Sequence, residues 1–308
     1  MYQSILVPLD GSQFAEQALP LALSIANRAG ASLEVVRVHV LYALQEPACS
    51  WLPFDPREDA IFKEHERAYL DAVVRRLQRT ASVPVTSALA DGSTVDGILE
   101  RARTKAADLI VMTTHGRGPM SRLWLGSVAV ELVRHGPAPI LLVRPQEDST
   151  APPPEPTPRR ILIPLDGSEL AERVLEPATA LGSLVDAEYV LIRAVESSSL
   201  PVGCPFVAEL TAAEQLRLEK RKAEAEAYLD RVAEGLHAKA FRAQTHVVVG
   251  ESAAAAVLDV VRSQNIDLVA IATHGRSGFK RLILGSVADK IVRGTLTPAL
   301  VYRPTTAD

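Results

Sequence analysis

Short runs of apolar, mostly β-branched residues alternate along this chain with longer segments that carry a helical repeat of apolar and polar positions. Continuous apolar runs are typical of strands that are buried on both faces of a parallel sheet. We expect such strands at 5–9, 33–40, 83–89, 109–112 and 140–143, and again at 161–165, 188–194, 243–249, 268–272 and 299–302. The expected helices are 13–28, 57–79, 94–105 and 127–134, then 169–181, 211–234, 253–264 and 286–293.

The two sets of elements belong to one internal repeat. Residues 5–12, ILVPLDGS, return as residues 161–168, ILIPLDGS, with seven of eight positions identical. Residues 113–145 and 272–304 share 17 identities in 33 positions without a gap. This spacing is far longer than a solenoid repeat, so it indicates a duplicated domain.

The seam between the copies is a proline-rich segment. Residues 146–157 read QEDSTAPPPEPT, which has too few apolar residues to pack a core and is typical of a stiff spacer. The sequence therefore predicts a domain at 1–145, a linker at 146–158 and a second domain at 159–308. Alternating strands and helices with right-handed crossovers predict an α/β fold, a doubly wound parallel sheet of five strands in each domain.

Composition narrows the function classes. The 308 residues carry a formal net charge of −4, which is a poor match for nucleic acid or an anionic membrane, so neither is an expected partner. Two cysteines do not make a disulfide-rich secreted scaffold. The chain shows no secretory signal and no apolar run of about 18 residues, so we expect a cytoplasmic protein.

Two motifs in each half fall where a ligand would bind. Ligands of doubly wound sheets lie beyond the carboxyl ends of the strands, where the winding reverses. The first strand of each half is followed by an aspartate, Asp10 or Asp166, which can bond a ribose hydroxyl or a metal ion held by phosphates. The loops 113–127 and 272–286 follow the fourth strands, and we expect them to face the aspartates across one crevice.

These loops have the features of an anion site. Each has a flexible glycine after the strand, a Gly-Ser pair where the next helix starts, and an arginine between them that can meet phosphate oxygens. The residues are Gly116, Arg122, Gly126 and Ser127 in the first half, and Gly275, Arg281, Gly285 and Ser286 in the second. Plain turn and helix-start roles would explain the same aspartates and glycines, and the arginines could be solvated surface charges.

These motifs make the chain resemble the tandem universal stress proteins, over nearly its whole length. In the ATP-binding branch of that family the loop reads Gly, two residues, Gly, nine residues, Gly, then Ser or Thr. Both halves keep this spacing but replace the first glycine, by Thr113 and by Ala272.

The resemblance implies a Rossmann-like fold of the adenine nucleotide alpha hydrolase-like type, and ATP as the ligand, with or without Mg²⁺. It places the base of the nucleotide near Val38 and Ala194, residues that a packed core would explain equally well. The positions that it assigns to the nucleotide, with no catalytic residue and no protein metal site among them, are Pro8, Asp10, Val38, Thr113, Gly116, Arg122, Gly126 and Ser127, and Pro164, Asp166, Ala194, Ala272, Gly275, Arg281, Gly285 and Ser286.

The expected function is therefore that of a stress-response protein that binds adenine nucleotide as a non-enzymatic switch or sensor. Two alternatives stay open: a nucleotide-free interaction module of the same fold, and a slow ATP hydrolase, for which the sequence offers no identifiable general base. We read His115 and His274 as structural or rim residues, because a histidine alone is not a catalytic unit.

Two further expectations concern asymmetry and assembly. Thr113 adds bulk at the ribose position and Pro119 removes a loop N–H, so the second half should bind nucleotide more tightly. The final strands 139–143 and 298–302 are expected to be sheet edges, which universal stress domains use to dimerise. The halves are therefore expected to pair with each other, and two chains to pair again as a homodimer.

Overall fold

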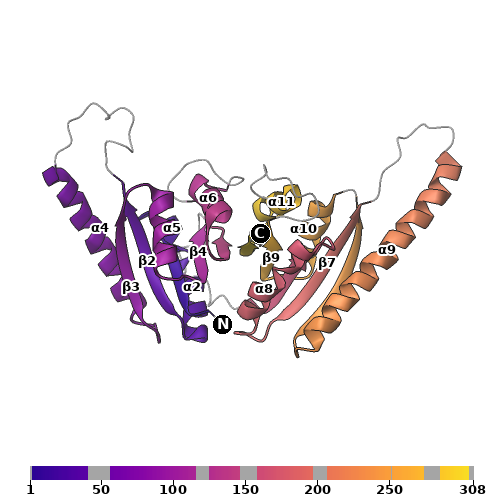
Figure 1. The fold of residues 1–308 in the computed structure, drawn as a ribbon, viewed down its shortest axis with the longest axis horizontal. Coiled ribbons are helices and arrows are strands. Elements are labelled where there is room, and N and C mark those ends of the chain that lie inside the picture. The colour runs from indigo at the N-terminus through magenta and orange to yellow at the C-terminus, as the bar shows by residue number, and fades with distance from the viewer. Residues whose placement is uncertain are drawn as a thin grey trace. The chain divides into compact units, whose positions relative to one another are not determined.

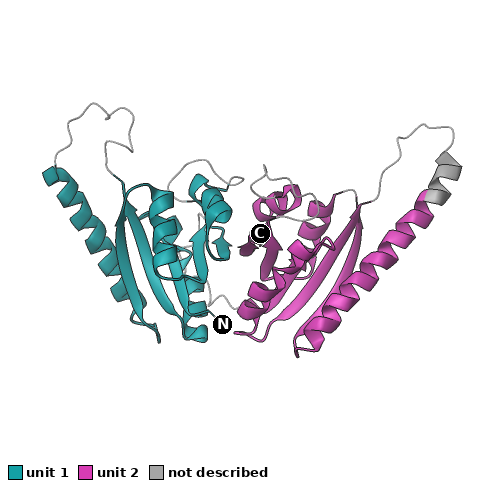
Figure 2. Ribbon diagram, in the orientation of Figure 1, with its two compact units in different colours: residues 1–157 teal, residues 158–308 magenta. Residues whose placement is uncertain are grey.

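The computed structural model describes residues 2–40, 56–115, 125–145, 158–196, 207–250, 252–273 and 285–304, with only the backbone for 207–213. The chain divides into two compact units, residues 1–157 and 158–308 (Figure 2). All of the expected linker except Pro158 lies outside the described residues.

Both units contain the same succession of elements (Figure 1). Unit 1 consists of β1 (Ser4–Pro8), α1 (Gln13–Glu16), α2 (Leu19–Ala29), β2 (Ser32–His39), α4 (Pro56–Leu77), β3 (Val85–Asp91), α5 (Thr94–Thr104), β4 (Leu109–Thr113), α6 (Ser127–His135) and β5 (Ile140–Val143). Unit 2 consists of β6 (Arg160–Pro164), α7 (Glu169–Glu172), α8 (Leu175–Gly182), β7 (Glu188–Glu196), α9 (Val207–His237), β8 (Arg242–Gly250), α10 (Ala253–Ser263), β9 (Leu268–Ala272), α11 (Ser286–Gly294) and β10 (Ala299–Tyr302).

Within each unit the five strands run parallel. Their order is β3-β2-β1-β4-β5 in unit 1 and β8-β7-β6-β9-β10 in unit 2. The central strands are almost wholly buried, as their continuous apolar runs predict. The predicted α/β class with parallel, doubly wound sheets is confirmed.

The winding reverses at the first strand of each unit. β1 pairs with β2 along one edge and with β4 along the other, and β6 pairs in the same way with β7 and β9. All these strands point the same way, so the segments that follow β1 and β4 leave the sheet at neighbouring places. This is the topological switch point at which such sheets bind ligands.

Side chains of β2 alternate between two covering layers of helices. Val38 faces α5, where it lies against Gly97, whereas Arg37 and His39 face α4 and contact Glu66 there. α1 lies on the same side as α4, because Tyr69 of α4 donates a hydrogen bond to Glu16. One strand therefore connects both helical layers of unit 1.

The helix expected at 13–28 is two helices. The Ser12 hydroxyl caps α1 by accepting a hydrogen bond from the Ala15 N–H, and α2 begins only at Leu19. Pro20 has no N–H to donate to the Glu16 carbonyl, so the helical ladder cannot run through this point. The segment expected at 169–181 is divided in the same way, and Pro177 there removes the corresponding bond to Arg173.

Unit 1 contains a buried carboxylate on β2 that unit 2 lacks. Glu34 accepts hydrogen bonds from Arg101 Nε at 2.5 Å and Arg101 Nη2 at 2.7 Å, and Lys105 Nζ lies 3.1 Å away. Burial alone would raise the pKa of Glu34, but the hydrogen bonds and positive charges of Arg101 and Lys105 outweigh it and lower the pKa. The corresponding residues of unit 2 are Val190, Val260 and Gln264, so an apolar contact stands in place of the ion pair.

We expect Glu34→Gln to destabilise unit 1 at neutral pH by about 2 kcal/mol, below the usual cost of breaking a fully buried pair because both cations are partly exposed. A carboxyl whose pKa is lowered by folding stabilises the fold above its unfolded pKa of about 4.3, and this stability is lost as pH falls through the folded value. The difference between wild type and variant should therefore shrink in acid. Urea unfolding followed by tryptophan fluorescence measures it, since Trp51 and Trp124 both belong to unit 1.

The contact between Val38 and Gly97 is the second place where the units differ. A Cβ placed on Gly97 would lie 2.9 and 3.0 Å from the two methyl groups of Val38, which is too close for carbon atoms. Unit 2 has Ala194 and Ala256 at the corresponding positions. The strand residue is smaller by two carbons and the helix residue larger by one, so the strand side chain leaves room for a Cβ on the helix.

We expect Gly97→Ala to destabilise wild-type unit 1 and to stabilise a Val38→Ala background. Overpacking costs about 1–3 kcal/mol, whereas alanine is about 1 kcal/mol better than glycine inside a helix once the clash is removed. A double-mutant cycle on urea unfolding measures the coupling energy. Purely additive effects would contradict the packing argument.

Candidate functional site

Each unit has one pocket at the carboxyl edge of its sheet. The pocket of unit 1 has a volume of about 680 Å³ and that of unit 2 about 620 Å³. Both lie at the switch point, where the ends of the first, second and fourth strands meet the start of the helix after the fourth strand. These volumes are within the range of small-molecule sites, about 300–1,000 Å³.

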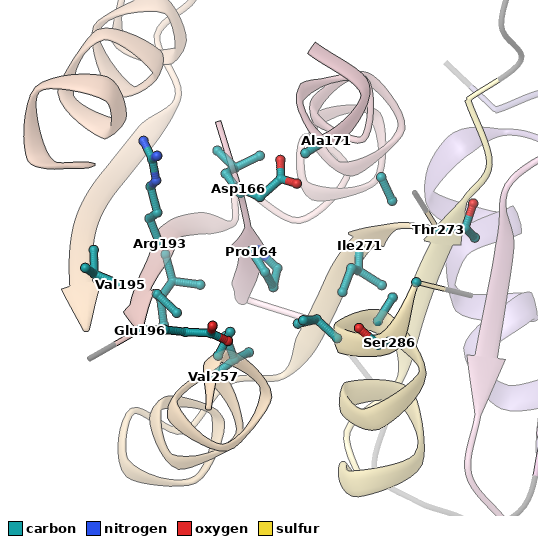
Figure 3. Close-up of a pocket in the computed structure, with 18 of the residues that line it drawn as sticks. Pro164, Asp166, Ala171, Arg193, Val195, Glu196, Val257, Ile271, Thr273 and Ser286 are labelled. Carbon is teal, nitrogen blue, oxygen red and sulfur yellow. The ribbon is translucent and has the colours of Figure 1, made fainter. Parts of the chain in front are cut away.

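The two pockets bring together every nucleotide position expected from the sequence that lies among the described residues. Those in unit 1 are Pro8, Asp10, Val38, Thr113, Gly126 and Ser127. Those in unit 2 are Pro164, Asp166, Ala194, Ala272, Gly285 and Ser286, several of which are labelled in Figure 3. Gly116 and Arg122, with Gly275 and Arg281, lie outside the described residues.

The aspartates are fixed by the turns that they begin. Asp10 Oδ1 accepts hydrogen bonds from the Ser12 N–H at 2.8 Å and the Ser12 hydroxyl at 2.6 Å, and Asp166 does the same with Ser168 at 2.9 and 2.6 Å. The residue between them has a φ of +84° at Gly11 and +87° at Gly167, a conformation that favours glycine. The DGS sequence therefore holds one carboxylate oxygen in place at the pocket wall.

The Gly-Ser pairs bring a helix start against the end of the fourth strand. The N–H of Gly126 donates to the Thr114 carbonyl at 2.8 Å, and a Cβ at this glycine would lie 3.1 Å from that oxygen. Gly285 and the Thr273 carbonyl repeat the arrangement at 2.7 and 3.2 Å. A side chain at either glycine would crowd this contact, so the close approach requires glycine.

The helices that start here have no side-chain cap. Ser12, Ser93 and Ser168 cap α1, α5 and α7 with their hydroxyls, whereas α6 and α11 begin at glycines without such a bond. N–H groups of a first helical turn have no partner inside the helix, and they carry the positive end of the helix dipole. Residues 126–129 and 285–288 line the pockets, so this positive end borders each cavity.

The two residues that replace the first glycine of the family pattern, Thr113 and Ala272, lie on the pocket walls. The Thr113 side chain is buried, and its hydroxyl donates a hydrogen bond to the His115 carbonyl at 3.1 Å. This bond holds the extra atoms of Thr113 in the turn. Ala272 is also buried and adds one methyl group at the same place in unit 2. His115 lies at the pocket of unit 1, 3.0 Å from the Thr114 hydroxyl, while His274 is outside the described residues.

Sequence reasoning missed the charged residues that enter the pockets from the second strand and the long helix. They are Arg37, His39 and Glu66 in unit 1, and Arg193, Glu196, Arg221 and Glu224 in unit 2. Arg37 lies over the Tyr69 ring and Arg193 over the Tyr228 ring, with 5.6 and 5.0 Å to the ring centres. Tyr69 and Tyr228 are 159 residues apart, so α4 and α9 correspond at this offset. The arginine and tyrosine that recur in both halves were the signal in the sequence from which these residues could have been found.

His39 is held between two carboxylates of α4. Its Nδ1 lies 2.7 Å from Glu66 Oε2 and its Nε2 lies 2.8 Å from Asp59 Oδ1. The side chain of His39 is 5% exposed. The hydrogen bond with His39 is the largest cause that holds the pKa of Asp59 below its usual value.

Unit 2 has no such cluster. With the offsets of 156 for the strands and 159 for the long helix, the corresponding residues are Val195, Leu218 and Ala225. Val195 and Ala225 are buried, and Figure 3 places Val195 beside Arg193 on β7.

Two negative findings apply to the described part of the chain. No helix there is long and apolar enough to cross a membrane. No group of three or more His, Cys, Asp and Glu side chains in the described ranges is placed to hold a metal ion.

Comparisons with known proteins agree with this architecture. The family model of the universal stress protein family matches residues 1–144 and again 157–303. The universal stress protein Rv2623 of Mycobacterium tuberculosis is 28% identical over 308 residues, covering 97% of this chain and 96% of its own length. A universal stress protein of Thermus aquaticus is 36% identical over 145 residues, which is 47% of this chain and all of the shorter protein.

Solved structures agree as well. The crystal structure of a universal stress protein from Archaeoglobus fulgidus matches with a TM-score of 0.70 at 18% identity, covering 97% of this chain and 98% of the other. At this identity the match is evidence for the fold alone, whereas the family model matches both halves of the sequence. The chain therefore belongs to the universal stress protein family, with two copies of the family domain in tandem.

Proposed function

We propose that each unit binds an adenine nucleotide in its pocket, and that the chain acts in the stress response as a non-enzymatic switch rather than as an enzyme. The observation that carries the proposal is the meeting of three features in one cavity: the aspartate after the first strand, the end of the second strand and an uncapped helix start. A cytoplasmic location and pairing through the final strands remain part of this proposal.

The residues present fit a nucleotide. The first-turn N–H groups of α11 and the Ser286 hydroxyl would bind phosphate oxygens, and Asp166 would bond a ribose hydroxyl. The end of β7 at Ala194 would border the base. Asp10, Val38 and Ser127 would take the same roles in unit 1. The glycine contact at Thr273 supports this arrangement, because it keeps the helix start free of a side chain on the pocket side.

We propose binding without hydrolysis, because both histidines of the unit 1 pocket already have hydrogen-bond partners. Hydrolysis needs a base within hydrogen-bond reach of a water molecule. His39 has a carboxylate at each ring nitrogen, and His115 lies against the Thr114 hydroxyl. The alternative of a nucleotide-free interaction module rests on Thr113 and Ala272, which stand where the ATP-binding branch has glycine.

We expect the purified chain to bind ATP in calorimetry, and its heat-denatured supernatant to contain adenine nucleotide. The paired variant Asp10→Asn, Asp166→Asn should bind at least about tenfold more weakly, since each loses a charged acceptor. Asparagine keeps the oxygen that Ser12 and Ser168 donate to, so the turns should stay folded. Absence of binding by wild-type chain that unfolds cooperatively would favour the interaction module.

We further propose that unit 2 is the tighter site. Thr113 brings two more heavy atoms to the wall than Ala272 does, and Pro119 removes a loop N–H that Gly278 keeps. One lost charge-assisted hydrogen bond weakens binding roughly ten- to hundredfold.

We expect Asp166→Asn to weaken the tighter phase of ATP binding by at least about tenfold, and Asp10→Asn, its matched control, to leave that phase intact. Tryptophan fluorescence separates the sites, because Trp124 belongs to the loop of unit 1 and unit 2 has no tryptophan. If Asp10→Asn removed the tighter phase instead, the argument from Thr113 and Pro119 would be wrong.

A further inference from the structure

The cluster of His39, Asp59 and Glu66 lies where α4 closes one side of the unit 1 pocket. His39 and Glu66 line the cavity, and Asp59 lies two turns before Glu66 on the same face of α4. Both carboxylates are shielded, with side chains 15% and 14% exposed. Asp59 thus links the first turn of α4 to the end of β2 through the imidazole ring.

The contacts determine how many protons this ring carries. Both ring nitrogens lie within 2.8 Å of a carboxylate oxygen, and an ionised carboxylate can only accept a hydrogen bond. Two such bonds need two N–H groups, so the arrangement requires the imidazolium form. Neutral imidazole has one N–H, and its other nitrogen would present a lone pair to a carboxylate.

The imidazolium would add a third positive group to two neighbouring cations. Arg37 of β2 bonds Glu66 at 2.9 Å, and Lys63 of α4 lies 3.5 Å from Asp59 and 2.7 Å from Asp91 at the end of β3. With the imidazolium, three positive groups face the three carboxylates of Asp59, Glu66 and Asp91. Loss of the ring proton leaves an excess negative charge beside the cavity, and Asp10 contributes a further carboxylate on its wall.

We propose that His39 makes nucleotide binding by unit 1 dependent on pH, whereas unit 2 binds independently of pH in the same range. This inference rests on the proposed function. Deprotonation of His39 releases Asp59 or Glu66, detaches the start of α4 from β2 and leaves the pocket with an excess negative charge. Both effects weaken the binding of an anionic ligand, so affinity falls as pH rises. Val195, Leu218 and Ala225 stand at the corresponding positions of unit 2, and their side chains do not titrate.

The experiment uses the full chain and ATP, between about pH 6 and pH 9, on either side of the ordinary histidine pKa of about 6.5. We expect affinity at unit 1, read from Trp124, to fall by about tenfold, the loss of one charge-assisted hydrogen bond. The affinity of unit 2 for ATP, measured by calorimetry in the Asp10→Asn chain over the same pH range, is the control for titration of ATP itself. The triple variant His39→Val, Asp59→Leu, Glu66→Ala copies unit 2 and should bind without this pH dependence.

A second measurement does not need nucleotide. Nitrogen-15 NMR of the histidine ring should show both nitrogens of His39 protonated at the acid end of this pH range, and hydrogen exchange at the start of α4 should accelerate, relative to α9, once the ring loses a proton. A single protonated nitrogen throughout the range, or the same pH dependence in the triple variant, would overturn the inference. Absence of ATP binding by both units would instead reject the proposed function, while the NMR and exchange results would still test the switch.

Discussion

The parallel pairing of the first strand with the fourth is the interaction on which both pockets depend. Ile5 and Leu6 pair with Leu109 and Ile110, while the other edge of β1 pairs with β2, so the winding reverses at this strand. The reversal places an aspartate turn and a helix start at one edge of the sheet. The glycine at the helix start then has to approach the strand carbonyl closely, which explains why the Gly-Ser pair occurs in both copies.

Duplication has kept this backbone frame and changed what fills it. The turns at Asp10 and Asp166 have the same hydrogen bonds within about 0.1 Å. The second strand, by contrast, carries Glu34, Val38 and His39 in unit 1, where unit 2 has Val190, Ala194 and Val195. Pairing of the backbone tolerates these exchanges, because each one is compensated by the helix that faces it. These differences lie where strand two meets α4 and α5, and two of them, at Val38 and His39, line the pocket of unit 1.

The sequence predicts the strands well because each is a continuous apolar run, and it predicts the aspartates and glycines because they follow strand ends directly. The sequence does not predict side-chain contacts that depend on which face a helix turns toward the sheet. His39 meets partners 20 and 27 residues later, and only the face that α4 presents to β2 brings them to the ring. Dense mixed charge, as on residues 57–79, is typical of a solvated helix face, yet Asp59 and Glu66 are shielded. Pro20 indicates the break after α1, but the apolar and polar positions of 13–28 follow one continuous helical pattern, which led to the prediction of a single helix.

Alternation along β2 gives unit 1 an ionic contact on each face of one strand. Glu34 points to α5 and binds cations, so this contact weakens when acid protonates the carboxylate. His39 points to α4 and binds carboxylates, so this contact weakens when base removes a ring proton. Acid weakens the contact with α5, the helix that also packs against Val38. Base weakens the contact with α4, the helix that carries Glu66. In β7, Val190 and Val195 replace the two residues that make these contacts, so neither contact exists at the corresponding positions of unit 2.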